Sequence, residues 1–207
     1  MSLSELPGNW QAPRLGGRHA TLEPLALGHA EGLRLALEGD ELSRLWYTNV
    51  PKATEVESWT RAALAKHAQG IEVPFVVRDA NGDVAGSTRF YDVDTSVPKL
   101  SIGYTWYAPR VQRTGLNTEV KLLLLTHAFE TLGCVAVYLE TSWFNHASRT
   151  AIARLGAKQD GILRNHRRHA DGTMRDTVVF SIIDKEWPAV KSNLGYKLEQ
   201  GERKHGQ

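Results

Sequence analysis

The chain has 207 residues, of which 42% are hydrophobic and 23% are charged, and its formal net charge at pH 7 is +2. This length and apolar content suit one globular domain with a sizeable core, and the charge is too small to favour nucleic acid as the main partner. The single cysteine, Cys134, excludes a disulfide framework and a cysteine-rich metal site, and no apolar run has signal-peptide or membrane-span length, so we expect a cytoplasmic protein that does not bind a membrane.

The first half of the chain predicts a few helices followed by an antiparallel meander. After an irregular lead-in over 1–18, a strand is expected within 19–27 and one or two short helices within 28–51, with core positions at Leu33, Leu37, Leu42 and Leu45. A further helix over 54–70 has Thr54 as its expected N-cap and Gly70 as its end. Asn81-Gly82 between two apolar runs is a strong hairpin signal, and a third strand in series gives a meander over 72–107.

The second half alternates helices and strands. Residues 115–133 predict a helix that ends at Gly133, and 134–143 predict a strand with Val135, Val137 and Leu139 on one face. A helix over 145–157 ends at Gly156, two strands flank Asp171-Gly172, and a last helix precedes a tail at 199–207, so we expect one domain over 19–198. The strand–helix–strand unit at 98–143 is a crossover, which implies a parallel pair inside a mostly antiparallel sheet.

The turn at 109–117 stands where this crossover helix begins. The first N–H groups of a helix lack intrahelical partners and attract negative charge, Gly115 permits close approach of the backbone, and Arg110 and Arg113 add positive charge. An ordinary solvated loop with a routine glycine is the alternative. Neither the P-loop motif nor the three-glycine dinucleotide motif is present.

Two segments together resemble the GNAT N-acetyltransferases. Gln112-x-x-Gly115-x-Asn117, preceded by Pro109, is similar to the loop that holds the pyrophosphate of coenzyme A in this family, and Asn145-x-x-Ser148 followed by Leu155-Gly156-Ala157 is similar to its next motif. The resemblance covers about residues 19–185, and three further segments look most like the RimJ/RimL-like branch that acetylates ribosomal-protein N-termini: Ile102-Gly103-Tyr104, Asn117-Thr118-Glu119 and Arg164-Asn165-His166. It implies an α/β (α+β) fold with a mixed, mostly antiparallel sheet of about six to seven strands, a central splayed parallel pair and flanking helices.

The resemblance also implies acetyl-CoA as the acyl donor, with no metal. The donor would lie between the splayed strands and be bound by Trp106, Tyr107, Val111, Gln112, Arg113, Thr114, Gly115, Leu116, Asn117, Thr118, Asn145 and Ser148. Backbone groups of Tyr107 and Val111 would contact the pantetheine arm, and an N–H group near Trp106 would polarise the carbonyl. Asn117 stands where the family has glycine or alanine, so its side chain either turns away from the phosphates or binds one, and a left-handed backbone would suit it.

The residues for proton transfer depart from the family pattern. Ile152 occupies the position of the usual tyrosine, which leaves Ser148 as the hydroxyl candidate, although Ser148 or Asn145 could instead serve only to cap the helix. No base stands out. Glu140 on the predicted central strand is the residue that we name, and the alternatives are a water chain or one of four side chains, Glu72, Asp92, His166 and His169.

The sequence therefore favours an N-acetyltransferase that acts on a primary amine, either a small molecule or a protein N-terminus. A protein that binds acetyl-CoA without turnover is the alternative, and a homodimer is compatible with the sequence. Nucleic-acid binding through Arg164, Arg167 and Arg168 is a weaker third hypothesis, because strand alternation separates Arg167 from Arg168. Aromatic residues are expected in the core or around the acceptor, namely Trp46, Tyr47, Phe90, Tyr91, Tyr104, Trp143 and Phe144.

Overall fold

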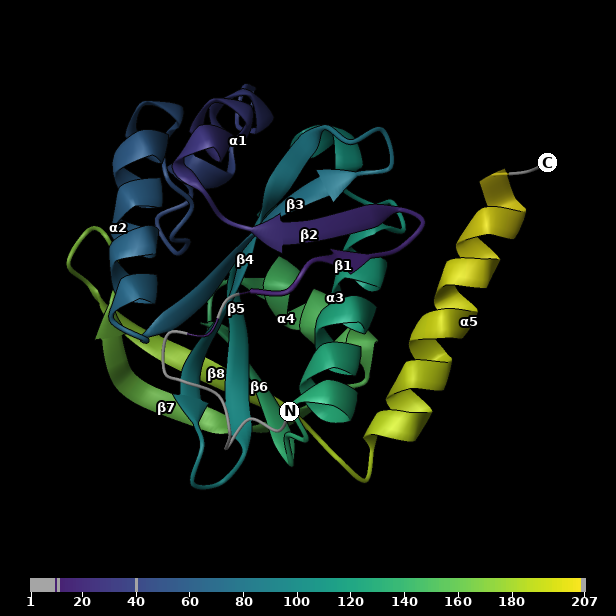
Figure 1. The fold of residues 1–207 in the computed structure, drawn as a ribbon. Coiled ribbons are helices and arrows are strands. Elements are labelled where there is room, and N and C mark those ends of the chain that lie inside the picture. The colour runs from purple at the N-terminus through teal and green to yellow at the C-terminus, as the bar shows by residue number, and fades with distance from the viewer. Residues whose placement is uncertain (1–9, 11, 40, 206–207) are drawn as a thin grey trace.

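One mixed sheet of eight strands forms the centre of the computed structural model, which describes residues 10, 12–39 and 41–205 (Figure 1). The strand order is β1-β2-β3-β4-β5-β6-β8-β7. The strands are β1 (Leu15–Gly16), β2 (Ala20–Pro24), β3 (Glu72–Asp79), β4 (Val84–Asp94), β5 (Lys99–Tyr107), β6 (Ala136–Ser142), β7 (Lys158–Arg168) and β8 (Met174–Ile183). The sheet architecture is the one predicted, and the two-residue β1 brings the strand number above the expected six to seven.

Helices cover both faces of this sheet. The α-helices are α1 (Ala30–Ala36), α2 (Val56–Ala68), α3 (Leu116–Thr126), α4 (His146–Leu155) and α5 (Trp187–His205). Short 3-10 turns occur at Leu27–His29, Leu42–Arg44, Ala53–Glu55 and Pro109–Val111, and a π-helical turn at His127–Thr131 extends α3. Figure 1 shows α1 and α2 together on one side of the sheet and α5 beside α3 on the other.

The central strands β5 and β6 form the only parallel pair among the described strands, and they diverge. Their register covers just three pairs, from Lys99 opposite Ala136 to Ser101 opposite Tyr138, although both strands continue beyond it. The other pairings are antiparallel, including the β3–β4–β5 meander. The predicted crossover and the predicted splay are therefore both present.

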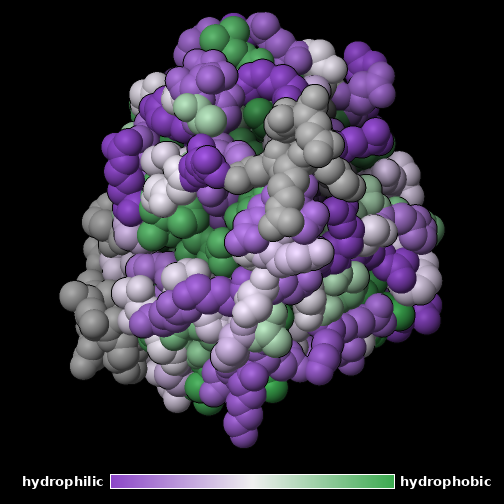
Figure 2. All heavy atoms as spheres, turned by 90° about the vertical axis from the view of Figure 1, so that its right-hand side faces the viewer, coloured by the Kyte–Doolittle hydropathy of each residue, from purple (hydrophilic) through white to green (hydrophobic). Residues whose placement is uncertain are grey.

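Strand alternation divides the core into two clusters. In β3, Phe75 and Val77 face the cluster formed with α3, α4 and α5, whereas Val76 faces the cluster formed with α1 and α2. Each of these three side chains is fully buried. Figure 2 views the α5 side of the molecule and shows a mainly hydrophilic surface with smaller hydrophobic areas, which agrees with a helix that buries one face only.

The predicted turn glycines adopt the left-handed backbone that their turns require. Gly82 in the β3–β4 turn has φ 86° and Gly172 in the β7–β8 turn has φ 85°. Gly70 after α2 and Gly156 after α4 have φ 74° and 105°. These positions ended the elements as predicted because glycine carries no Cβ that would oppose this conformation.

Several local predictions were wrong. Thr54 is not an N-cap, because the 3-10 turn Ala53–Glu55 precedes α2 and the Glu55 side chain caps the Lys52 N–H group. Leu42 and Leu45 are only half-buried, and Val135 precedes β6 and is exposed. The start of the lead-in, residues 1–9 and 11, lies outside the described residues, but β1 forms within it, and α5 continues to His205 where a tail was expected.

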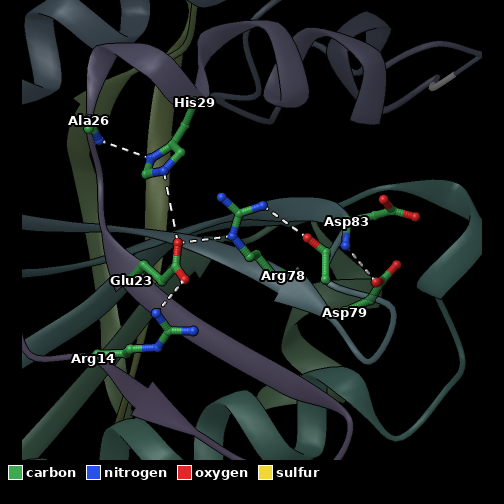
Figure 3. Close-up of polar contacts among 8 residues, drawn as sticks. Arg14, Glu23, Ala26, His29, Arg78, Asp79 and Asp83 are labelled. Atoms are coloured by element: carbon green, nitrogen blue, oxygen red, sulfur yellow. Dashed lines mark hydrogen bonds and ion pairs between the residues drawn. The ribbon is translucent and has the colours of Figure 1, made fainter.

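A group of charged residues ties β2 to β3 (Figure 3). The Glu23 carboxylate on β2 accepts a 2.9 Å hydrogen bond from Nε of Arg78 on β3 and lies 3.2 Å from the Arg14 guanidinium. Arg78 also donates to the Gly82 carbonyl oxygen, at 2.9 Å, in the β3–β4 turn. The hydrogen bond from Arg78 lowers the pKa of Glu23.

The carboxylate of Glu119 on α3 holds the lead-in against that helix. It accepts hydrogen bonds from the backbone N–H groups of Arg18 (2.9 Å), His19 and Ala20 (2.7 Å). A Cβ atom on Gly17 would come within 2.3 Å of this carboxylate, so Gly17 leaves the space that Glu119 occupies. The predicted boundary at residue 18 thus falls inside a tightly bonded turn.

Candidate functional site

A cavity of about 470 Å³ opens where β5 and β6 diverge. We call it the splay cavity. Its walls come from six parts of the chain: the outer ends of β5 and β6, the loop after β5, the helices α3 and α4, the segment 42–50, the β7–β8 pair, and Tyr91 of β4. Because the ladder between β5 and β6 stops at Ser101, backbone and side chains of both strands beyond that point border the cavity.

The loop between β5 and α3 is tightly folded by its own hydrogen bonds. The Gln112 side-chain amide donates to the Tyr107 carbonyl oxygen at 3.1 Å, and Thr114 Oγ1 donates to the Val111 carbonyl oxygen at 2.7 Å. Arg113 has φ 63°, so the left-handed residue of this loop is Arg113 and not Asn117, which lies in the first turn of α3. The suggestion of a left-handed Asn117 was wrong, because α3 begins at Leu116 and Asn117 therefore has a helical backbone.

The two arginines of the loop separate. Arg113 lines the splay cavity, as do Gln112 and Asn117. Arg110 instead turns to the β3–β4 turn, where its guanidinium lies 3.0 Å from Asp79 and donates to the Val84 carbonyl oxygen at 3.0 Å. Only Arg113 therefore adds the positive charge that was expected from both.

The start of α3 borders the cavity at Asn117 and has backbone N–H groups without helical partners. The first intrahelical bond runs from the Glu119 N–H to the Gly115 carbonyl oxygen at 3.0 Å, so the N–H groups of Asn117 and Thr118 precede the helical ladder. Gly115 itself has an ordinary φ of −68°, and a Cβ on it would meet the His19 ring at 3.3 Å. Its lack of a side chain is thus explained by packing against His19.

Most of the residues predicted to hold the acyl donor border the splay cavity, and four do not. The lining includes Trp106, Tyr107, Val111, Gln112, Arg113, Asn117, Asn145 and Ser148. Thr114, Gly115, Leu116 and Thr118 are absent from it, and Leu116 is a core residue.

The outer part of β5 presents its backbone rather than its largest side chain. The Trp106 ring is buried in the cluster with α1 and α2, 6.3 Å from the Trp59 ring. A bulge places Tyr104 and Thr105 opposite the single residue Thr88 of β4, and Tyr104 takes a φ of 52° there. This irregular backbone borders the cavity, where bulges characteristically redirect the chain next to functional sites.

The start of α4 supplies Asn145 and Ser148. The Asn145 side-chain oxygen accepts a 3.0 Å hydrogen bond from the Ser148 N–H, so Asn145 is the N-cap of α4 and Ser148 is not. The amide nitrogen of Asn145 is left for another partner, since the cap uses the oxygen. Ser148 and Ile152 lie one helical turn apart and both line the cavity.

Lys121 lies at the inner wall of the cavity, and sequence reasoning missed it. Its residue is 5% exposed, and its Nζ donates a 2.8 Å hydrogen bond to Thr105 Oγ1, which in turn lies 2.8 Å from Thr88 Oγ1. Burial lowers the pKa of Lys121 to about 7. A signal was available, because this lysine stands inside the apolar run Val120–Leu125, where a charged side chain is unexpected.

Glu140 lies on the face of β6 away from α3 and borders the cavity beside two arginines. Its carboxylate accepts a 3.1 Å hydrogen bond from Arg167 on β7, and its side chain is 13% exposed. Arg175 on β8 is opposite Arg167 in the ladder and also lines the cavity. Neither arginine could be assigned to the cavity from sequence, because the β7–β8 hairpin reaches it only through the sheet order.

The four side chains named as alternative bases lie outside the cavity lining. Glu72 is buried in ion pairs with Arg89 and Lys66, and Asp92 is 61% exposed at 4.0 Å from Arg167. His166 is exposed, whereas His169 is buried at an edge-on ring distance of 4.7 Å from Trp46. None of these four borders the splay cavity.

The aromatic residues divide between core, cavity and surface. Tyr47, Tyr91 and Tyr104 line the splay cavity, and Phe90 is fully buried in the core. Trp46 and Phe144 line a separate shallow depression, and Trp143 packs its ring 4.2 Å from the Arg149 guanidinium. Cys134 is 3% exposed, and the His127 ring stacks on Phe90.

Within the described ranges, no group of three or more His, Cys, Asp or Glu side chains is placed to hold a metal ion. None of the helices described here is long and apolar enough to cross a membrane.

Known proteins with a similar sequence or structure point to one family. Residues 19–158 match the family described as "Acetyltransferase (GNAT) domain". The chain is 27% identical over 157 residues to "Uncharacterized N-acetyltransferase YoaA" of Bacillus subtilis (strain 168), which covers 74% of this chain and 87% of that protein. A crystal structure of a GCN5-related N-acetyltransferase from Brucella melitensis superimposes with a TM-score of 0.82 at 30% identity, covering 92% of this chain and 87% of the other.

A RimJ structure shares the fold at lower identity. Mycobacterium smegmatis RimJ in complex with CoA-disulfide has a TM-score of 0.74 and 20% identity, and the match covers 91% of this chain and 96% of RimJ. At this identity the likeness concerns the fold alone.

Proposed function

Because the chain belongs to the GNAT acetyltransferase family, we propose that it transfers an acetyl group from acetyl-CoA to a primary amine. Its class as an acyltransferase follows from the family. The acceptor is a small-molecule amine or a protein N-terminal amine. The observation that carries the proposal is the splay cavity, which opens between β5 and β6 and has the start of α3 at its mouth.

The residues at this mouth fit the diphosphate part of coenzyme A. The early N–H groups of α3 and the positive end of its dipole favour an anion, and Arg113 adds a full charge. Gln112 is fixed by its bond to the Tyr107 carbonyl oxygen, which holds the loop open toward the cavity. When bound, acetyl-CoA supplies an activated acetyl group that leaves sulfur for the amine nitrogen, while the nitrogen gives up a proton to a base and the sulfur receives one from an acid.

The deeper wall supplies groups for that transfer. We propose that the backbone near Trp106 donates a hydrogen bond to the acetyl oxygen, because the β5 bulge turns this backbone toward the cavity. Ser148 is the proposed proton donor to sulfur. The Asn145 amide nitrogen, which the helix cap leaves available, is proposed to bind the pantetheine arm.

Glu140 is the proposed proton acceptor for the attacking amine. It borders the cavity on the face of β6 opposite the donor helices, so it can meet an amine that approaches from the segment 42–50 and the β7–β8 hairpin. Its hydrogen bond with Arg167 holds the carboxylate in place.

The alternative is that the protein binds acetyl-CoA without turnover. Ile152, which lines the cavity where many relatives carry a tyrosine, is the observation that favours it. Thiol release from acetyl-CoA, measured against polyamines, amino acids and peptides, separates the two. Release with at least one acceptor is expected, and calorimetric binding of acetyl-CoA with no release for any of them would support the alternative.

Ser148→Ala tests the proposed proton donor. We expect kcat to fall more than acetyl-CoA affinity, because the hydroxyl acts on the departing sulfur and not on the bound donor. Thr150→Ala, on the exposed side of the same helix, is the matched control and should keep both values. An equal loss of kcat and affinity would make Ser148 a binding residue only.

Four further proposals concern the domain, the branch of the family, the location and the assembly of the protein. We propose that residues 19–198 act as one domain, and that this domain lies in the RimJ/RimL-like branch, whose fold it shares. A cytoplasmic location is proposed from the sequence. A homodimer is compatible with it and is tested by the mass of the protein in solution.

A further inference from the structure

The acceptor end of the splay cavity contains a guanidinium that lacks an acidic partner. Arg175 lines the cavity, and its Nε is buried without a hydrogen-bond partner in the described structure. Within that structure, no carboxylate lies within 4.0 Å of Arg175, whereas Arg167 opposite it is paired with Glu140 at 3.1 Å. Arg175 is half-buried, and a partly desolvated charge without a partner is unfavourable, so Arg175 is suited to an anion brought by a bound molecule.

The charges around the cavity support the same conclusion. Four cationic side chains line it, namely Arg113, Lys121, Arg167 and Arg175, against the single acidic residue Glu140. Glu140 is already engaged by Arg167. Burial and the neighbouring Arg167 lower the pKa of Arg175, which means that an anion at this point would relieve an unfavourable charge.

Strand alternation separates Arg175 from the proposed donor end. Val178 and Phe180 of β8 are buried in the cluster with α3 and α4, so Arg175, Thr177 and Val179 lie on the opposite face. Glu140 is paired with Val179 in the ladder and shares that face. Asn117 and Lys121 reach the cavity from α3, on the other side of the sheet.

We propose that Arg175 binds a carboxylate carried by the acceptor, so that the substrate class is an amine that also bears an acidic group. This inference rests on the proposed acetyl transfer and names its acceptor. The guanidinium fork is matched to two carboxylate oxygens. Arg175 is opposite Arg167 in the β7–β8 ladder, and Arg167 donates to Glu140, so the proposed acid-binding group lies next to the Glu140–Arg167 pair.

Peptides that differ in one carboxylate test the proposal. The probes are pairs of short peptides with a free N-terminus that carry Asp or Asn at one of the first three positions, so that charge changes with little change in size. We expect kcat/KM for at least one Asp peptide to exceed that of its Asn partner by about tenfold or more, since hydrogen bonds to charged groups have this magnitude. Arg175→Gln should remove the preference, so that kcat/KM becomes equal for the Asp peptide and its Asn partner.

Two further variants make the result specific. Arg175→Lys keeps the charge without the fork and should keep part of the preference. Arg164→Gln removes a surface arginine of β7 that is 80% exposed, paired with Asp176 and outside the cavity lining, and it should keep all of the preference. Equal use of Asp and Asn peptides, or a preference that survives in Arg175→Gln, overturns the proposal.

A binding measurement keeps the inference separate from the proposed function. Calorimetric titration of the same peptides into the protein saturated with coenzyme A needs no turnover. If an Asp peptide binds more tightly than its Asn partner and Arg175→Gln abolishes this difference, the carboxylate site is supported even if no thiol is released. If turnover and binding show no charge preference, the site is refuted and the proposed acetyl transfer is unaffected. Loss of coenzyme A affinity in Arg175→Gln, with the peptide preference unchanged, would assign Arg175 to the donor and overturn the proposal.

Discussion

Nζ of Lys121 donates a 2.8 Å hydrogen bond to Oγ1 of Thr105, on the part of β5 that has diverged from β6. This contact ties α3 to the bulged strand at the inner wall of the splay cavity. It also keeps the Lys121 amine buried, and burial favours its neutral form. The charge of Lys121 at this wall therefore changes near neutral pH.

Lys121→Met should stabilise the fold in a pH-dependent way. The folded pKa of about 7 lies below the ordinary value of 10.5, so the cost of burying the amine is fully present below pH 7 and declines as pH rises toward 10. We expect the variant to gain about 1–4 kcal/mol at pH 7 in urea unfolding, because replacing a buried charge by an apolar side chain often has this effect. The gain should shrink between pH 7 and pH 10.

The matched control for this measurement is Lys185→Met, at an exposed position before α5. Its unfolding free energy should follow that of the wild type at every pH. A constant difference between Lys121→Met and the wild type from pH 6 to pH 10 would contradict the buried-amine interpretation.

Glu23→Gln should destabilise the fold at neutral pH and not in acid. The hydrogen bond from Arg78 lowers the pKa of Glu23 below 4.5, so its stabilising contribution is present above pH 4.5 and is lost as pH falls through the folded value. Denaturation at pH 7 and pH 3 checks this. Glu38→Gln, whose side chain is 58% exposed, is the control and should have little effect at either pH.

Gly115→Ala tests whether packing explains the glycine of the loop. The added Cβ would lie 3.3 Å from the His19 ring, so we expect a loss of about 1 kcal/mol that His19→Ala in the same chain partly removes. Affinity for coenzyme A should be kept, since Gly115 does not line the cavity. If the losses in unfolding free energy from Gly115→Ala and His19→Ala are purely additive and coenzyme A binds more weakly, Gly115 instead serves the close approach of a phosphate to the backbone.

Substitution of Asn145 separates helix capping from ligand binding. Asn145→Ala removes the bond to the Ser148 N–H and should cost about 1 kcal/mol, whereas Asn145→Asp keeps a capping oxygen and should keep the stability. Both variants lack the amide nitrogen, so both should bind coenzyme A more weakly in calorimetry. If the aspartate variant binds as well as the wild type, Asn145 is a cap and no more.

The sequence by itself determined the order of the elements and the place of the turns. Asn81-Gly82 and Asp171-Gly172 marked hairpins because glycine tolerates a left-handed backbone, and the crossover around α3 implied the parallel pair. The motif around Gln112 was sufficient to indicate the family and to place the mouth of the cavity, since both depend on residues close together in the chain.

Only the tertiary structure decided which side chains meet at the cavity. Lys121 reaches Thr105 because α3 packs on β5, and Arg175 reaches the acceptor end because β8 pairs with β6 as well as with β7, its neighbour in sequence. Local pattern assigned Arg110 and Gly115 to an anion. In the structure Arg110 forms an ion pair with Asp79 and Gly115 packs against His19, both from distant segments. Such contacts depend on sheet order and on packing distances of a few ångströms, which periodicity and spacing along one chain do not specify.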